Sequence, residues 1–267
     1  MTPVEVVQGD GPVILGLPHT GTHVPQDIRA RLNANGCLLS DTDWHVDDLY
    51  AGLLEGATTV RATFNRYVID ANRPPSQQSL YPGQNTTGLV PLTDFDGRPI
   101  WQDGFEPGAE DIAARLRAFH GPYHAALEAE VARVEARHGV VILYDCHSIR
   151  GQVPFLFAGR LPDLNIGTNN GRTCAAGVEA LVHARCADHP GYSTVLNGRF
   201  RGGWTPRHYG HPEQGRHALQ MEIAQSAYMT ERPPWTWQAD RAARLRDLLA
   251  TILNDLAALA PTLRGTR

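Results

Sequence analysis

The chain has 267 residues, of which 42% are apolar, and its formal net charge at pH 7 is −4. This composition can build a sizeable hydrophobic core, and it excludes an intrinsically disordered chain. No block of basic residues stands out, which argues against nucleic acid as a partner. No apolar run approaches the roughly 20 residues that a membrane span needs.

The first residues, MTPVE, show neither the basic segment nor the apolar segment of a secretory signal peptide, so we expect a cytoplasmic protein. Free thiols are expected in that reducing compartment, because no Cys-x-x-Cys spacing links Cys37, Cys146, Cys174 and Cys186. The sequence contains no linker or internal repeat, and we expect a single domain over residues 1–267. The oligomeric state stays open.

Two apolar runs, each typical of a buried strand, deliver a histidine to their carboxyl ends. Residues 13–17 lead to His19, and the strand predicted at 140–148 carries Asp145 and His147. Ligands of open α/β sheets bind at such strand ends. Asp145 and His147 are two residues apart and so point to one face, where a carboxylate can fix the imidazole tautomer for metal binding or general-base catalysis. The alternative is a strand end whose polar residues only cap the next loop.

Residues 41–54 predict a helix that Asp41 or Thr42 caps, with acidic residues in its first turn. Asp43 and Asp47 are four residues apart and therefore share one helix face. Favourable interaction with the helix dipole and solubility explain some acidic residues here. However, the four aspartates within residues 41–48 are more than these two roles require.

A weaker strand is predicted at residues 57–62, and a polar cluster follows it. Arg66, Asp70, Asn72 and Arg73 crowd around a Tyr-Val-Ile centre. A surface loop can hold such residues, but two arginines with an Asp and an Asn in a core-like run suit a buried polar network or an anion site.

Residues 76–108 are rich in Gly, Pro, Gln, Thr and Asp and predict a long loop, which in compact domains is usually functional or mobile. Residues 109–137 predict a helix that Pro122 breaks or bends. His120 and His124 have a spacing that can hold a metal, but no third ligand accompanies them in a known pattern. We therefore interpret both as ordinary surface or core histidines.

The rest of the chain continues the alternation of strands and helices. Strands are predicted at 155–157, 164–168, 192–196 and 217–224, and helices at 174–186 and 237–263. This alternation implies an α/β sandwich with a mainly parallel or mixed sheet.

Two further features of this second half indicate a site. The loop at 197–210 is rich in Gly and carries three arginines, which lets its backbone and its cations approach an anion, although a solvated basic loop is the alternative. Glu222 lies inside the last predicted strand, between Met221 and Ile223. Burial there raises the pKa of the Glu222 carboxyl, as a general acid or base near neutral pH requires.

The order of these motifs resembles that of the N-formylglutamate amidohydrolase family. The resemblance covers about residues 10–230 and depends on six motifs together: PHTG at 18–21, DWHVD at 43–47, RYVIDANR at 66–73, DCHS at 145–148, NGRFRGG at 197–203 and QME at 220–222. It implies an α/β three-layer sandwich with a mixed, mainly parallel sheet, similar to the zinc-dependent exopeptidases and the N-acetylmuramoyl-alanine amidases. It also implies hydrolysis of N-formyl-L-glutamate to formate and L-glutamate in histidine degradation.

The resemblance further implies a divalent metal, Zn²⁺ or another ion, with His19 and His147 among its ligands. The His-x-x-Glu motif of the carboxypeptidases is absent, because Thr22 stands three residues after His19. The acidic ligand then comes from the predicted helix start, as in the muramoyl amidases, and we favour Asp43 over Asp47.

The remaining roles follow from the chemistry that the resemblance implies. Glu222 would be the catalytic acid or base, and Asp145 would support a metal-bound histidine. The two carboxylates of the substrate call for cations and hydrogen-bond donors, for which the candidates are Arg66, Asn72, Arg73, Arg201 and Arg207.

Three alternatives remain. The first is an amidohydrolase of the same fold that acts on another N-acyl amino acid, and the second is a non-catalytic binder of acidic amino acids. The third is a metal-free hydrolase that uses Ser148 and His147, which lacks a Gly-x-Ser-x-Gly motif.

Overall fold

A mixed seven-stranded sheet runs through the protein in the order β1-β3-β2-β4-β7-β5-β6. The computed structural model describes residues 2–80 and 82–263. Its strands are β1 (Val4–Val7), β2 (Val13–Leu17), β3 (Thr58–Ala62), β4 (Val141–Ile149), β5 (Leu164–Gly167), β6 (Thr194–Leu196) and β7 (Arg216–Ala224). The predicted mixed sheet is therefore confirmed, and β4 from the middle of the chain lies between β2 from the first third and β7 from the last third.

Four neighbouring strands of this sheet are parallel. β3 pairs in parallel with β2, β2 with β4, and β4 with β7, whereas β1 and β5 run antiparallel to their neighbours β3 and β7. The carboxyl ends of the four parallel strands consequently meet at one edge of the sheet, where ligands of α/β folds bind.

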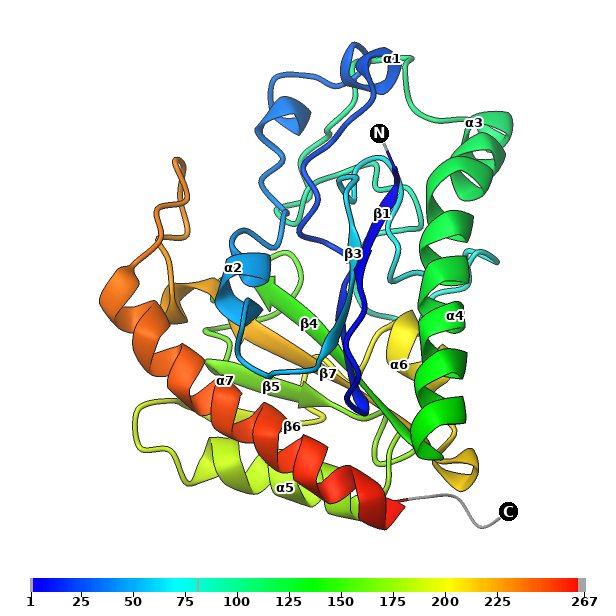
Figure 1. Ribbon diagram of the computed structural model, residues 1–267. Helices are drawn as coiled ribbons and strands as arrows, with labels where there is room; N and C mark the ends of the chain where they lie inside the picture. The colour runs from blue at the N-terminus through cyan, green and yellow to red at the C-terminus, as the bar shows by residue number, and fades with distance from the viewer. Residues whose placement is uncertain (1, 81, 264–267) are drawn as a thin grey trace.

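Helices cover both faces of the sheet (Figure 1). One face packs against α4 (Gly121–His138), and the other packs against α2 (Val46–Tyr50), α5 (Ala176–Ala187) and α7 (Ala239–Leu259). The short helices are α1 (Gln26–Arg29), α3 (Ala109–Arg115) and α6 (Trp204–Tyr209). No helix within the described residues is long and apolar enough to cross a membrane.

The segment predicted as a helix at 41–54 folds differently from that expectation. Helix α2 covers only Val46–Tyr50, because the preceding residue, His45, has a left-handed backbone with φ of 61°. Asp41 does not cap it. Its Oδ2 instead accepts hydrogen bonds from the Tyr67 hydroxyl and the Phe95 backbone N–H. Tertiary partners thus replace helix capping in this segment.

Three other local predictions meet different outcomes. The helix expected at 109–137 forms in two parts, α3 and α4, joined by a π-helical turn that ends just before Pro122, as predicted. The strand expected at 155–157 is wrong, because these residues form turns. The segment expected as a loop at 197–210 contains the short helix α6. Strand β1 was not predicted, because three of its four residues are exposed and give no buried apolar run.

Candidate active site

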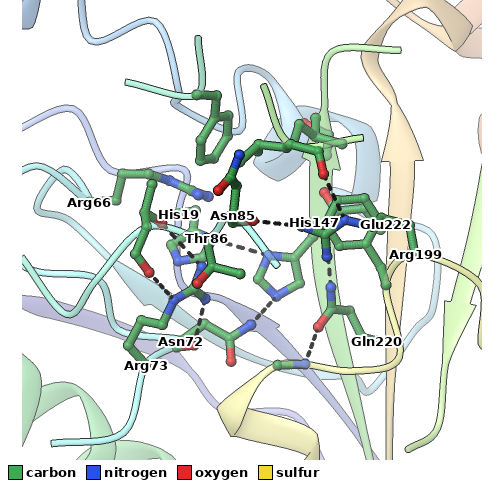
Figure 2. A pocket seen from close by; sticks show the side chains of 17 residues that line it. His19, Arg66, Asn72, Arg73, Asn85, Thr86, His147, Arg199, Gln220 and Glu222 are labelled. Atoms are coloured by element: carbon green, nitrogen blue, oxygen red, sulfur yellow. Dashed lines mark hydrogen bonds between the residues drawn. The ribbon is translucent and has the colours of Figure 1, made fainter. Parts of the chain in front are cut away.

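A pocket opens at the carboxyl ends of β2, β4 and β7 (Figure 2). β2 leads directly to the loop of His19, while β4 and β7 themselves carry the polar pocket residues near their ends. The segment after β3, the loop after β4 and the loop after β6 supply the rest. The charged and amide side chains that line the pocket are His19, Arg66, Asn72, Arg73, Asn85, His147, Arg199, Gln220 and Glu222.

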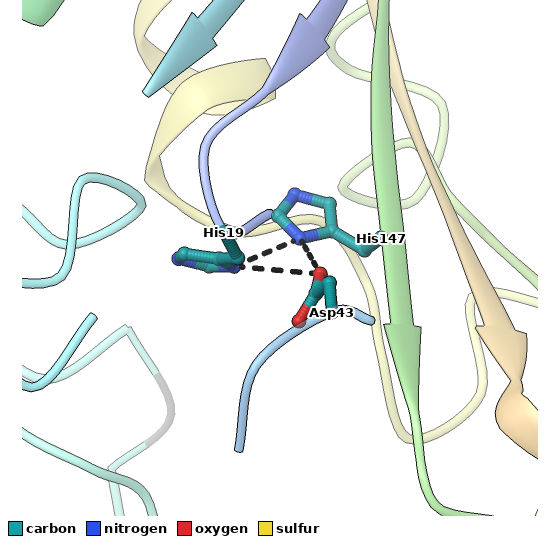
Figure 3. A group of neighbouring side chains, drawn as sticks. All are labelled: His19, Asp43 and His147. Carbon is teal, nitrogen blue, oxygen red and sulfur yellow. Dashed lines mark hydrogen bonds and ion pairs between the residues drawn. The ribbon is translucent and has the colours of Figure 1, made fainter. Parts of the chain in front are cut away.

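At the base of this pocket the side chains of His19, Asp43 and His147 converge (Figure 3). The two histidine Nδ1 atoms are 3.1 Å apart, and Asp43 Oδ2 lies 3.7 Å from Nδ1 of His19 and 3.3 Å from Nδ1 of His147. Ligands about 2.0–2.2 Å from a tetrahedral Zn²⁺ stand about 3.3–3.5 Å from one another. The three potential ligand atoms therefore have the mutual spacing that a divalent metal requires.

The outer nitrogen of each histidine faces a carboxylate. His19 Nε2 lies 2.7 Å from Asp70 Oδ1, and His147 Nε2 lies 2.7 Å from Asp145 Oδ2. A carboxylate only accepts hydrogen bonds, so each Nε2 carries a proton and donates it. In the neutral ring that metal binding requires, each Nδ1 would then present a lone pair, and a cation between the two Nδ1 atoms and the carboxylate oxygen would stabilise this arrangement.

The charges around the cluster also favour a cation. Burial alone would raise the pKa of Asp43, but Arg66, whose Nη2 donates to Asp43 Oδ1 over 2.7 Å, and the two histidines hold that pKa well below its usual value. The Ser148 backbone N–H donates to the other Asp43 oxygen over 3.1 Å. Burial would lower the pKa of His147, yet Asp145 and Asp43 raise it well above its usual value. Positive charge is therefore stabilised at this position.

Two adjacent strands place four polar side chains in register beside the cluster. Asp145 on β4 pairs with Gln220 on β7, and His147 pairs with Glu222. Because residues two apart on a strand share a face, all four point to the same side of the sheet. Gln220 Nε2 donates to Glu222 Oε2 over 2.9 Å. Burial raises the pKa of the Glu222 carboxyl to about 7, in the range of a general base at neutral pH.

Backbone N–H groups at the start of α6, from its N-cap Gly203 and its first turn, hold the amides of this network. The Gly203 N–H donates to Gln220 Oε1 over 2.7 Å, and the Thr205 N–H donates to Asn72 Oδ1 over 2.8 Å. Asn72 Nδ2 then faces Asp145 Oδ2 at 3.3 Å. A Cβ atom at Gly203 would lie only 2.4 Å from Asn72 Nδ2, so the close approach of this N-cap residue requires glycine.

The structure brings together most of the residues that the sequence proposed, and it separates the two candidate acidic ligands. Asp43 is fully buried in the cluster, whereas Asp47 is 38% exposed and pairs with Arg61. Arg201 is exposed, and Arg207 donates to the carbonyl oxygen of Gly202. Neither of these two arginines lines the pocket.

Sequence reasoning assigned no role at the site to Asp70, Asn85, Arg199 or Gln220. Arg199 lines the pocket, and Asp70 holds the outer nitrogen of His19. Both stand inside motifs that the sequence had singled out. Spacing alone, however, could not rank Arg199 above Arg201 or show that the fold brings Asp70 to His19.

His120 and His124 of the α3–α4 region do not join the cluster. His120 Nε2 lies 3.0 Å from the carbonyl oxygen of Arg73, and His124 Nε2 lies 2.8 Å from that of Ala71. Both rings are almost entirely buried. These histidines therefore hold the backbone of the segment that carries Asp70, Asn72 and Arg73.

Ser148 is not arranged as a nucleophile. Its Oγ lies 2.8 Å from the Tyr228 hydroxyl, while the two ring nitrogens of His147 face Asp145 and the cluster. A serine that attacks a carbonyl needs a hydrogen bond to its base. This geometry does not support the metal-free alternative.

Two buried histidines and a carboxylate beside a buried glutamate, at the carboxyl ends of parallel strands, are typical of mononuclear metal hydrolases. The family model for N-formylglutamate amidohydrolase matches residues 11–229. The chain belongs to this family, and the prediction that it is an amidohydrolase enzyme of the family is confirmed.

Individual relatives agree with this assignment. The chain is 45% identical to the N-formylglutamate deformylase of Pseudomonas aeruginosa and 42% identical to that of Pseudomonas putida, with 94% of each chain covered in both cases. The crystal structure of an N-formylglutamate amidohydrolase from Ralstonia eutropha superimposes with a TM-score of 0.81 at 27% identity, covering 98% of this chain and 99% of that one. A protein of Agrobacterium tumefaciens, 20% identical, shares the fold with a TM-score of 0.71 over 96% of each chain.

Proposed function

We propose that the protein hydrolyses N-formyl-L-glutamate to formate and L-glutamate, the reaction that the family resemblance assigns to histidine degradation. The names of its relatives support the substrate. The observation that carries the chemistry is the convergence of two histidine lone pairs and a carboxylate on one point, beside Glu222, at the base of a pocket lined by arginines.

His19, Asp43 and His147 would hold the metal, with Zn²⁺ as the first choice because imidazole and carboxylate ligands at these spacings suit it. When bound, a divalent ion supplies a Lewis acid that polarises a carbonyl group and acidifies water. Asp70 and Asp145 fix the two imidazoles in the tautomer that ligation needs. Arg66 balances the charge of Asp43 and keeps its carboxylate oriented.

Glu222 is the group proposed to move the proton. Its carboxylate accepts a proton from the attacking water, whose oxygen forms the new bond to the formyl carbon. The C–N bond then breaks, and Glu222 delivers the same proton to the departing amine nitrogen. Gln220 holds one oxygen of this carboxylate through its Nε2, and a pKa of about 7 allows Glu222 both to accept and to release the proton.

Formate release by purified protein tests the proposal. The protein is assayed with N-formyl-L-glutamate before treatment with a chelator, after treatment, and after addition of Zn²⁺. We expect loss of activity on metal removal and its return with the ion. A panel of other N-acyl amino acids separates the proposed substrate from the alternative of a different acyl group.

Two results would count against the proposal. Full activity in protein shown by elemental analysis to be free of metal would refute the metal. Release of another acyl group from glutamate in preference to formate would refute the substrate.

A further inference from the structure

We propose that Arg199 binds the side-chain carboxylate of the substrate and that Arg73 binds its α-carboxylate. This inference rests on the proposed function and deepens it, because it assigns the residues that select glutamate. It also moves the specificity role away from Arg201 and Arg207, which do not line the pocket.

The three arginines that line the pocket differ in how deeply they are buried and in the groups that they contact. Arg66 is buried and lies 2.7 Å from Asp43, so its charge is already matched by the cluster. Arg73 is 21% exposed, and its Nη1 lies 3.9 Å from Asp70. Arg199 is half-buried and donates from Nε to the Leu156 carbonyl over 3.1 Å. Arg66 is thus committed to the cluster, whereas Arg73 and Arg199 are partly exposed where they line the pocket and can meet a bound anion.

Both of these guanidinium groups are held in place by the same short segment of the loop between β3 and α3. Arg73 donates from Nε and Nη2 to Thr87, and Arg199 donates from Nη2 to the Asn85 carbonyl over 2.9 Å. The two carboxyl carbons of glutamate are separated by four carbon–carbon bonds of about 1.5 Å, which is about 5 Å when extended. Carboxylates that far apart need two separate cations, and this segment holds two.

The contacts of each arginine decide which carboxylate it meets. Asp70 contacts both Arg73 and His19, so a single side chain separates Arg73 from the cluster of His19, Asp43 and His147. The α-carboxylate is two bonds from the scissile nitrogen and must lie near the cluster. Arg199 comes from the opposite wall, and in Figure 2 it and Arg73 lie on opposite sides of His147. The more distant side-chain carboxylate therefore falls to Arg199.

Apolar side chains beside Arg199 suit the methylene groups of the substrate. Leu156 and Phe200 line the same wall, and the Arg199 guanidinium lies 5.4 Å from the centre of the Phe200 ring. An apolar wall that ends in a cation matches a side chain with two methylene groups and a terminal anion.

The test compares kcat/KM for N-formyl-L-glutamate and N-formyl-L-glutamine in the metal-supplemented enzyme. The wild type should prefer glutamate by about 10- to 150-fold, the range of one charged hydrogen-bonded contact. Arg199→Met should abolish this preference and leave the glutamine substrate within about threefold. Arg199→Lys keeps the positive charge but cannot form the two parallel hydrogen bonds of a guanidinium, so it should retain part of the preference for glutamate. The matched control, Arg201→Met, lies two residues away outside the pocket and should keep the full preference.

Arg73→Met should lower kcat/KM for both substrates alike, because both carry the α-carboxylate. The assignment is overturned if Arg199→Met keeps the preference, if Arg201→Met loses it, or if the wild type uses both substrates equally. If no protein releases formate from either substrate, the proposed function fails instead. Calorimetric binding of the same two compounds to the wild type, Arg199→Met and Arg201→Met then still decides the subsite.

Discussion

The two aspartates that the sequence could not separate give the sharpest test of the metal site. Asp43→Ala removes a fully buried carboxylate from the cluster, whereas Asp47→Ala removes one that is 38% exposed and pairs with Arg61 over 3.3 Å. The two residues are four positions apart and undergo the same chemical change. Any difference in stability or metal content between the two variants therefore reflects the different surroundings of Asp43 and Asp47.

The structure sets different magnitudes for the two changes. Without Asp43, the buried Arg66 loses its carboxylate partner at 2.7 Å, which typically costs about 3–5 kcal/mol of unfolding free energy. Asp70 and Asp41 also stabilise the charge of Arg66, so we expect the lower end, about 3 kcal/mol. The exposed pair of Asp47 and Arg61 contributes less than about 1 kcal/mol.

Two measurements check this expectation. Urea unfolding of the metal-free proteins gives the stabilities, and elemental analysis after gel filtration gives the metal content. Wild type and Asp47→Ala should retain about one metal ion per chain, while Asp43→Ala should lose it, since removal of a supporting residue alone already costs about 10- to 100-fold in affinity. Metal retained by Asp43→Ala but lost by Asp47→Ala would refute the assignment.

Three further predictions concern the base Glu222, His124 of α4 and Gly203 before α6. Glu222→Gln should keep the metal and lower kcat by about 100-fold or more. In the wild type, kcat/KM should fall at or below about pH 7, where the carboxyl becomes protonated, and wild-type turnover by the variant would exclude Glu222 as the base. Burial lowers the pKa of His124 to about 3, below its unfolded value of about 6.5. As the pH falls, His124 is therefore protonated in the unfolded chain before it is protonated in the folded protein. The contribution of His124 to the free energy of unfolding is fully present above pH 6.5 and is reduced by about 2 kcal/mol at pH 5. His124→Gln should remove that part of the pH dependence in urea unfolding. Gly203→Ala should lower kcat/KM by about 10- to 100-fold, because the added Cβ displaces Asn72. The control Gly177→Ala, where nothing lies within 4 Å of the added Cβ, should leave kcat/KM unchanged. Unchanged kinetics in Gly203→Ala would contradict this prediction.

Local sequence patterns determined the features of this protein that depend on neighbours along the chain. Five apolar residues followed by polar ones predicted β4, because a buried strand needs a continuous apolar run. The spacing of Asp145 and His147 predicted that they share a face, and their side chains meet at 2.7 Å. The buried position of Glu222 within β7 was predictable for the same reason. The family followed from six motifs in order.

Only the tertiary structure decided how these segments combine. Asp43 is distinguished from Asp47 because His45 delays the start of α2, which leaves Asp43 in a buried turn against Arg66. Asp70 becomes the partner of His19 although 51 residues separate them.

The choice among the arginines has the same cause. Arg199 and Arg201 stand two residues apart in one Gly-rich loop, and no pattern in the sequence distinguishes them. Carbonyl groups from two other loops, at Leu156 and Asn85, hold Arg199 on the pocket wall, while Arg201 stays exposed. Spacing along the chain sets which side chains share a face, but contacts between distant segments set which of them face the pocket.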